Sequence, residues 1–342
     1  MPIFSSDSFT KIDKVVSNLP NDTMRLELFL SDYCNYQCWY CSDEYHSKTV
    51  SWPSLDILLP NFLHLLDYYK STGKTKFIIH IGGGEPSMWP GVVDFVKAIK
   101  AHSSCIVSLT TNASRTVRWW EENARYFDHI AISVHHERAD PNHISQVGDI
   151  IYKNKVPMWV SVLMDPTNWG KCTDIVNTLK QSRYKWAINT SQVQHQSISY
   201  TEDQKKYLDK KSHRNNSLFY EFFVIPREPK NPKPTVWYKG KSKKVSQHWL
   251  LLNGFNNFMG WECNVGIDTV FINKQGDLKG SCGNTLYGKD FYFNILRENF
   301  KEEFNPEIKP VICEMSRCIC QPEANCTKTN LNEIKYIKIL RE

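Results

Sequence analysis

Three cysteines near the N-terminus have the spacing of a metal-binding loop. They are Cys34, Cys38 and Cys41, within the stretch CNYQCWYC. Thiolate sulfur binds both zinc and iron–sulfur clusters, and a tetrahedral zinc site needs four ligands. The loop is therefore one ligand short. A zinc ion would recruit a further protein ligand such as His46, whereas an iron–sulfur cluster can leave one iron open to a substrate or cofactor.

The distribution of the 11 cysteines favours metal sites over disulfides. The first residues, MPIFSSDSFTKIDKVV, lack the order of a signal peptide, and no run of about 18 apolar residues is present. We therefore expect a cytoplasmic protein without a membrane partner, and that compartment keeps thiols reduced. Cys105 and Cys172 stand apart from the clusters and are expected to be buried thiols.

The overall composition is that of a globular protein with a mildly basic surface. Hydrophobic residues make up 41% of the chain, charged residues 23%, and the net charge is +6. This charge permits an acidic partner without requiring one. A Pro- and Lys-rich segment at 225–249 includes Trp237, Tyr238 and Trp249, so a nucleic-acid-binding arm is an alternative to a solvated loop.

Six short apolar runs separated by helix-like stretches predict the sheet that positions the cysteine loop. Helix candidates lie at 54–73 and at 90–102, where Pro90 lies near the helix start. Strand–helix–strand units form parallel sheets, either open or closed into an incomplete barrel, and ligands bind beyond the carboxyl ends of the strands. The expected strands are 26–31, 77–82, 106–111, 129–134, 158–164 and 186–193.

A glycine-rich turn, GGGEP, follows the second expected strand, from Gly82 to Pro86. Consecutive glycines let the backbone approach a ligand closely. Glu85 offers an acceptor for an ammonium group. Such a turn is a weak signal by itself, but it lies at the same edge of the expected sheet as the cysteine loop. The two motifs are therefore expected to serve one site.

Together, these two motifs resemble the radical S-adenosylmethionine (radical SAM) superfamily. The resemblance rests on the CxxxCxxC spacing at 34–41 and on GGEP at 83–86, with TTN at 110–112 and SVH at 133–135 near the ends of later strands. It covers roughly residues 24–195. It implies an α/β fold with a partial (β/α)6 TIM-like barrel and a small C-terminal cysteine-rich α+β auxiliary domain.

The resemblance also implies the cofactors and the residues that hold them. In the family, three cysteines hold a [4Fe–4S] cluster, and S-adenosylmethionine (SAM) chelates the fourth iron. Cys34, Cys38 and Cys41 would be these ligands. Around SAM, Tyr40 is expected near the adenine, and Gly83, Gly84 and Glu85 at the methionine amino group, with Pro86 completing the motif. Ser133, with Thr111 or Asn112, is expected at the ribose. His135 is a further candidate, and its alternative role is that of an ordinary hydrogen-bonded barrel residue.

Six further cysteines near the C-terminus predict a second metal site. The segment from Cys263 to Cys282 resembles the hairpin of SPASM and twitch extensions, in which flanking cysteines bind an auxiliary cluster. The spacing of the later cysteines departs from the family pattern, and a structural zinc site is the alternative. Six cysteines cannot ligate two four-iron clusters. We expect one auxiliary [4Fe–4S] cluster held by four of Cys263, Cys282, Cys313, Cys318 and Cys320, with Cys326 as the spare.

These features divide the chain into four expected parts. They are an N-terminal extension at 1–23, the radical SAM core at 24–224, a Pro/Lys-rich linker or loop at 225–254, and the auxiliary domain at 255–342. The last part should contain two short strands joined by a turn at NKQGD, and an amphipathic helix at 331–342. Because only the first part precedes the expected barrel, we expect no domain that recognises a leader peptide.

The function implied by the resemblance is radical chemistry on a C–H bond. A reductant such as flavodoxin or ferredoxin would supply an electron, SAM would be cleaved to methionine and a 5′-deoxyadenosyl radical, and the radical would abstract a hydrogen atom. We expect a peptide or protein substrate, or oxidation of a substrate, with a small molecule or nucleotide as the alternative. A hypothesis of another class is a metal-stabilised nucleic-acid-binding protein, against which the GGEP motif argues.

Overall fold

The computed structural model describes residues 11–41, 47–183, 186, 188–193, 198–214, 234–245, 250, 254–279, 293–314, 316, 318 and 326–331. The chain forms two compact units. The barrel unit comprises residues 28–63 and 78–228. The terminal unit comprises residues 1–27, 64–77 and 229–342. Three elements contain residues of both units, so the division does not follow the sequence order: β2 (Thr23–Phe29), α1 (Leu55–Ser71) and β3 (Lys76–Gly82).

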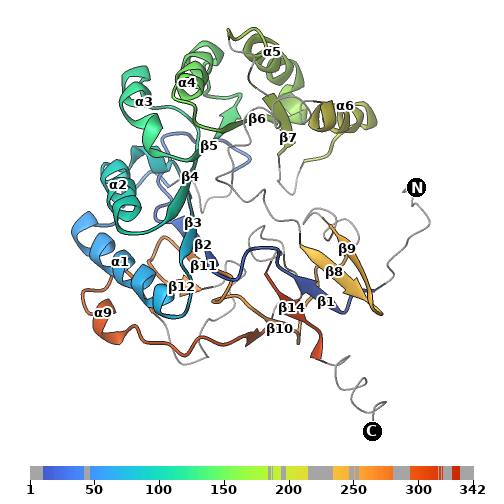
Figure 1. The fold of residues 1–342 in the computed structure, drawn as a ribbon. Helices are drawn as coiled ribbons and strands as arrows, with labels where there is room; N and C mark the ends of the chain where they lie inside the picture. Colours follow the sequence, from blue (N-terminus) through green and yellow to red (C-terminus); the bar gives the residue numbers. More distant parts are fainter. Residues whose placement is uncertain are drawn as a thin grey trace. The chain divides into compact units, whose positions relative to one another are not determined.

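A curved sheet runs through the barrel unit (Figure 1), and two of its strands, β11 (Thr269–Ile272) and β12 (Leu278–Lys279), lie in residues of the terminal unit. The sheet order is β12-β11-β2-β3-β4-β5-β6-β7, and the pairs from β4 to β7 are parallel. All six strands expected from the apolar runs are present, although β2 ends two residues early and β7 is shorter at both ends. Their bounds are β2 (Thr23–Phe29), β3 (Lys76–Gly82), β4 (Cys105–Thr111), β5 (His129–His135), β6 (Met158–Met164) and β7 (Ile188–Gln192).

Helices follow the strands, and α2 to α5 lie on the outer side of the sheet (Figure 1). In α2, the buried residues Val92, Phe95, Val96 and Ile99 have the spacing of one helix face. This helix begins after Gly91, so Pro90 precedes it. The helix bounds are α1 (Leu55–Ser71), α2 (Val92–His102), α3 (Val117–Asn123), α4 (Pro141–Lys153), α5 (Trp169–Leu179) and α6 (Glu202–Arg214), with 3-10 turns η2 (Pro86–Met88), η3 (Ala124–Tyr126) and η4 (Pro166–Asn168).

The side chains of β5 alternate between two faces of the sheet. One is the core face, which packs against the helices, and the opposite one is called the inner face below. Ile130, Ile132 and Val134 are buried, whereas the alternating residues Ser133 and His135 are only half-buried. Side chains alternate between the two faces of a strand. The apolar set therefore packs beneath the helices, and the polar set points to the side where the chemistry is expected.

The terminal unit contains a second sheet built from segments far apart in the sequence. Residues 235–244, within the expected linker or loop, form a hairpin that pairs with a strand from the expected N-terminal extension. The turn at Lys239 and Gly240 has positive φ at both residues, and Val236 is fully buried. The sheet order is β13-β10-β14-β1-β8-β9, with bounds β13 (Val311–Ile312), β10 (Glu262–Cys263), β14 (Lys328–Thr329), β1 (Lys14–Val16), β8 (Thr235–Tyr238) and β9 (Lys241–Lys244).

The hairpin expected at NKQGD is confirmed. Strand β11 (Thr269–Ile272) pairs antiparallel with β12 (Leu278–Lys279), and Gly276 has a φ of 86° in the turn between them. A short helix, α9 (Phe300–Glu303), follows later in this unit. Apart from Leu331, the expected C-terminal helix lies outside the described residues. Within the described part of the chain, no helix is both long enough and apolar enough to cross a membrane.

Candidate functional site

The cysteine loop lies just beyond the carboxyl end of β2. Cys38 is buried, whereas Cys34 and Cys41 are half-buried. The Tyr36 N–H donates to Cys34 Sγ at 3.3 Å, and the Cys41 N–H donates to the Cys38 carbonyl at 3.0 Å. These hydrogen bonds join residues only two or three positions apart. The three cysteines therefore lie in one locally hydrogen-bonded segment.

The glycine-rich turn after β3 packs directly against the chain that leads into the cysteine loop. The Gly84 N–H donates to the Ser31 carbonyl at 3.0 Å, and the Glu85 N–H donates to the Tyr33 carbonyl at 2.7 Å. A Cβ on Gly84 would lie 2.1 Å from the Tyr33 oxygen, and Gly83 has a φ of 111°. The glycines are therefore needed for this close backbone approach, whatever else they contact.

The Glu85 carboxylate ties the turn to the end of β4. It is 1% exposed, and burial raises its pKa while its hydrogen bonds oppose the rise. Oε1 accepts from the Ser87 N–H at 3.0 Å and from the Thr111 hydroxyl at 2.7 Å, and Oε2 accepts from the Asn112 N–H at 2.5 Å. A carboxylate can accept about four hydrogen bonds, so capacity for one further donor remains.

Asn112 connects the end of β4 to the cysteine loop. Its side-chain N–H group donates to Asn35 Oδ1 at 3.0 Å and lies 3.8 Å from Cys34 Sγ. Asn35 in turn donates to Ser114 Oγ at 2.9 Å. The expected ribose residues Thr111 and Asn112 thus have internal partners, and both touch groups of the two motifs. Pro86, the last motif residue, begins η2.

Tyr40 and His135 lie against each other at the carboxyl end of β5. The Tyr40 hydroxyl is 3.1 Å from His135 Nδ1, and the two rings stack with centroids 5.9 Å apart. Burial, followed by the neighbouring His136, lowers the His135 pKa to about 4. His135 is therefore neutral near pH 7, where it can hold the Tyr40 hydroxyl without introducing a charge.

A row of polar side chains crosses the inner face beside His135. Ser133 is in register with Ser161, and Ser161 with Asn189. Ser161 Oγ is 2.5 Å from Ser191 Oγ. Of these four residues, the sequence analysis singled out only Ser133. Ser161 is a single polar residue in the apolar strand β6, and that contrast is the signal that could have identified it, whereas β7 is mostly polar and gives no such signal.

The donor set of the loop fits an iron–sulfur cluster. Burial raises the pKa of the Cys34 thiol to about 11 and that of Cys38 to about 12, so metal binding must release their protons. Among the described residues, no three His, Cys, Asp or Glu side chains converge as a single metal ion requires. A four-iron cluster takes one thiolate on each ligated iron, so three cysteines would leave the fourth iron open. His46 lies outside the described residues.

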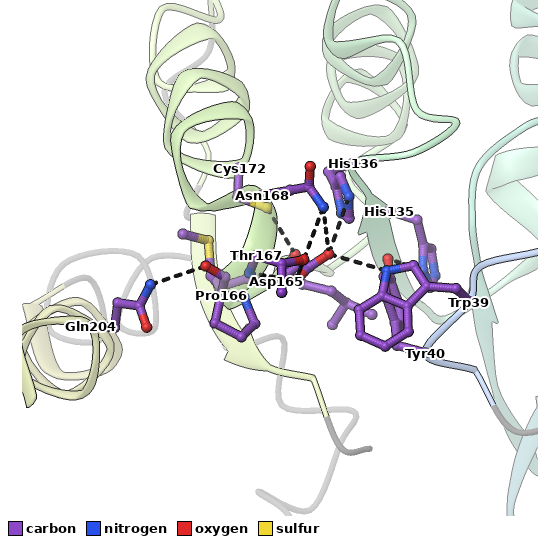
Figure 2. Close-up of polar contacts among 12 residues, drawn as sticks. Trp39, Tyr40, His135, His136, Asp165, Pro166, Thr167, Asn168, Cys172 and Gln204 are labelled. Atoms are coloured by element: carbon purple, nitrogen blue, oxygen red, sulfur yellow. Dashed lines mark hydrogen bonds and ion pairs between the residues drawn. The ribbon is translucent and has the colours of Figure 1, made fainter. Parts of the chain in front are cut away.

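Trp39, His136 and Asp165 form a network that the sequence analysis did not identify (Figure 2). Asp165 follows β6 and is fully buried, and its Oδ2 accepts from the Trp39 indole N–H at 3.2 Å. The same oxygen lies 3.5 Å from His136 Nε2. Beside this network is a cavity of about 380 Å³ lined by Gln37, Trp39, His136, Glu137, Arg138, Asn168 and Lys171.

The described C-terminal cysteines are buried in the terminal unit. Cys263 in β10 is paired with Val311 on one side and with Lys328 on the other. Strand alternation places Cys313, two residues after Val311, on the same face as Cys263. Cys326 lies two residues before Lys328 and is 1% exposed. Cys318 is also buried, whereas Cys282 and Cys320 lie outside the described residues.

Comparison with protein families and curated proteins finds similar sequences for part of the chain. Residues 28–162 match the family model of the radical SAM superfamily. GTP 3′,8-cyclase of Synechococcus elongatus is 34% identical over 88 residues, which cover 25% of this chain and 26% of the cyclase. The chain therefore matches only about a quarter of the length of this curated relative.

One solved structure shows the same fold. The structure of hexahistidine-tagged anSMEcpe with bound AdoMet matches with a TM-score of 0.50 and 14% identity, over 83% of this chain and 80% of that one. Streptococcus suis SuiB bound to S-adenosylmethionine matches with a TM-score of 0.46 and 12% identity, over 82% of this chain and 63% of that one. At this level of identity, the anSMEcpe match supports the fold alone, namely a partial TIM-like barrel.

Proposed function

This chain carries a radical SAM domain in residues 28–162, and from this premise we propose that it binds a [4Fe–4S] cluster through Cys34, Cys38 and Cys41. The observation that carries the proposal is the contact between two motifs that lie far apart in the sequence. The GGEP turn hydrogen-bonds to residues 31 and 33, directly before the first cysteine. One end of the barrel therefore presents the thiols and the glycine-rich turn together.

When bound, the cluster and SAM supply a 5′-deoxyadenosyl radical that abstracts a hydrogen atom from a C–H bond. The chain's own residues hold these groups in place. Glu85 has one acceptor position left for the methionine ammonium group, and Asn112 lies beside Cys34. Tyr40 presents its ring on the inner face next to His135. Ser133, on the same face, is assigned to the ribose together with Thr111 or Asn112.

One experiment tests this chemistry directly. The protein is reconstituted with iron and sulfide without oxygen, reduced and mixed with SAM, and 5′-deoxyadenosine is measured. We expect its release from wild-type protein and none from the Cys38→Ala variant. A fully loaded wild-type cluster that releases no 5′-deoxyadenosine would refute the proposed function.

We further propose that the terminal unit binds one auxiliary [4Fe–4S] cluster, as the SPASM/twitch resemblance of its hairpin implies. Support comes from the antiparallel β11–β12 hairpin and from Cys263 and Cys313, which share a face of the second sheet. The buried thiols Cys318 and Cys326 belong to the same unit. Cys282 and Cys320 stay in the proposed ligand set on the sequence alone.

For the substrate, we propose a peptide or protein whose C–H bond is modified or oxidised. The auxiliary-cluster resemblance supports this class, because relatives with such domains often modify peptides. The electron donor is proposed to be a small redox protein such as flavodoxin or ferredoxin. A nucleotide is the second candidate, favoured by the local identity with GTP 3′,8-cyclase. Deuterium transfer from labelled peptides or labelled GTP into 5′-deoxyadenosine distinguishes the two classes.

A further inference from the structure

Asp165 lies at a junction of three chain segments in the barrel unit (Figure 2). Its Oδ1 accepts from the backbone N–H and the hydroxyl of Thr167, at 2.8 and 2.7 Å. Its Oδ2 accepts from Asn168 Nδ2 at 2.9 Å and from Trp39 Nε1 at 3.2 Å. The carboxylate is fully buried, so each of these donors replaces a water molecule that it would otherwise bind.

Local structure explains only part of this arrangement. As the N-cap residue of η4, Asp165 needs one oxygen to accept from the N–H of Thr167. The second oxygen reaches Trp39, which is 126 positions away in the chain. Capping of η4 requires no such contact. Because the buried Asp165 carboxylate bonds both to η4 and to Trp39, it fixes the cysteine loop relative to the end of β6.

Trp39 transmits this constraint to the cysteine loop. It stands between Cys38 and Tyr40, and its ring packs edge-on against Tyr40 with centroids 5.7 Å apart. Trp39 is 42% exposed, so burial alone does not hold its side chain in one position. The hydrogen bond to Asp165 adds a constraint on this side chain, within the segment between two proposed cluster ligands, Cys38 and Cys41.

His136 adds a second connection from the same oxygen. It is 3% exposed, its Nε2 lies 3.5 Å from Asp165 Oδ2, and its ring stacks on Tyr40 with centroids 5.9 Å apart. His136 Nδ1 has no hydrogen-bond partner among the described residues. The ring is therefore oriented by Asp165 from one side, and it supports Tyr40 from the other.

We propose that Asp165 is a positioning residue for the cluster-binding loop, which acts through the Trp39 indole and through His136. It does not touch the cluster or SAM. It sets the orientation of the Cys38–Trp39–Tyr40 segment, and hence the environment of the cluster and the fit of SAM against Tyr40. This proposal rests on the proposed cluster site, and its test is built to separate the two.

The test compares Trp39→Phe, which keeps an aromatic ring but loses the N–H donor, with Asp165→Asn and with the double variant. We expect all three variants to retain iron and to show shifted g values in the electron paramagnetic resonance spectrum of the reduced cluster. We also expect them to bind SAM roughly tenfold more weakly, which corresponds to the loss of one hydrogen bond to a charged group. The double variant should be no worse than Asp165→Asn, because both changes remove the same contact.

Asp128→Asn is the matched control. Asp128 immediately precedes β5, at the opposite end of the strands, and accepts from Lys100 Nζ and the Val107 N–H at 2.8 Å each. We expect this variant to lose stability while its cluster spectrum and SAM affinity stay at wild-type values.

The proposal is overturned if Trp39→Phe has the wild-type spectrum and SAM affinity, if Asp128→Asn shifts both as strongly, or if the Trp39 and Asp165 effects add fully. Trp39→Phe decides the matter even where Asp165→Asn fails to fold. Wild-type protein that holds a cluster but releases no 5′-deoxyadenosine refutes the proposed function, whereas the spectral comparison still tests Asp165.

Discussion

The Glu85 carboxylate organises the proposed SAM site before any ligand is bound. Its donors come from Ser87 in η2 and from Thr111 and Asn112 at the end of β4. Each donor would be left unpaired in a buried place if the carboxylate were lost. A residue singled out for ligand binding is thus also part of the framework that joins the GGEP turn to β4.

Glu85→Gln should therefore destabilise the protein even without cofactors. The amide N–H₂ group cannot accept a hydrogen bond, so one of the donors at Thr111, Ser87 or Asn112 loses its partner. We expect the free energy of unfolding of the apo protein to fall by about 2 kcal/mol, measured by urea denaturation. Glu122→Gln, at an exposed ion pair with Arg118, should change it by less than about 0.5 kcal/mol. Equal stabilities of the two variants would contradict this role of Glu85.

His135 should make stability depend on pH in the acid range. Its folded-state pKa of about 4 lies below the ordinary histidine value of 6.5, because of burial and the neighbouring His136. Between these values the unfolded chain binds a proton that the folded chain does not, so stability falls as pH falls. The free energy of unfolding of the apo protein should fall between about pH 8 and about pH 5. We expect this fall to be about 2 kcal/mol smaller in the His135→Gln variant than in the wild type. Identical pH dependence of the wild type and variant would show that His135 does not contribute.

At the scale of elements, the turn after β3 and the chain after β2 act as one structural piece. Backbone hydrogen bonds from Gly84 and Glu85 join them, and no side chain could fit between the two backbones at Gly84. The cysteine loop begins immediately after this contact. Its starting point is therefore set by the packing of two strand ends, and not by the loop residues themselves.

Gly84→Ala should disrupt this packing. The added Cβ would lie 2.1 Å from the Tyr33 carbonyl oxygen, so the backbone must move. We expect a loss of at least about 2 kcal/mol in apo stability, together with reduced iron uptake on reconstitution. Gly170→Ala is the control, because nothing lies within 4 Å of its Cβ and alanine favours the helix. Wild-type iron uptake by Gly84→Ala would show that the close approach is dispensable.

At the scale of the whole molecule, the proposed cluster sites belong to different compact units. Cys34, Cys38 and Cys41 are in the barrel unit, and the described C-terminal cysteines are in the terminal unit. Cys263 lies in β10 of the second sheet, whereas the cysteine loop follows β2 of the other sheet. Loss of one set of ligands should therefore leave the other site able to bind iron.

A variant with alanine at Cys34, Cys38 and Cys41 tests this independence. We expect about four irons per chain to remain after reconstitution, because an auxiliary [4Fe–4S] cluster does not use these thiols. Iron and zinc are counted on the purified variant, and 5′-deoxyadenosine release should be absent. Zinc in place of iron, or no metal at all, would contradict the auxiliary cluster while leaving the barrel site untouched.

Most of the barrel could be predicted from the sequence, because its signals are local. Met158–Met164 is a largely apolar run of strand length, and it forms β6 with the expected bounds. The linker expected at 225–254 was harder to interpret, since four consecutive exposed residues from Lys241 to Lys244 resemble a solvated loop. They form an edge strand because β8 pairs with β1, more than 200 residues earlier in the sequence.

The sequence by itself determined which groups are proposed to carry the chemistry, because the CxxxCxxC and GGEP motifs depend on spacing within a few residues. Only the tertiary structure showed what holds these groups in place. The Asp165–Trp39 hydrogen bond joins positions 126 residues apart, and Glu85 receives its donors from another strand end. No local pattern encodes such contacts, because they depend on which strand ends the folded sheet brings together.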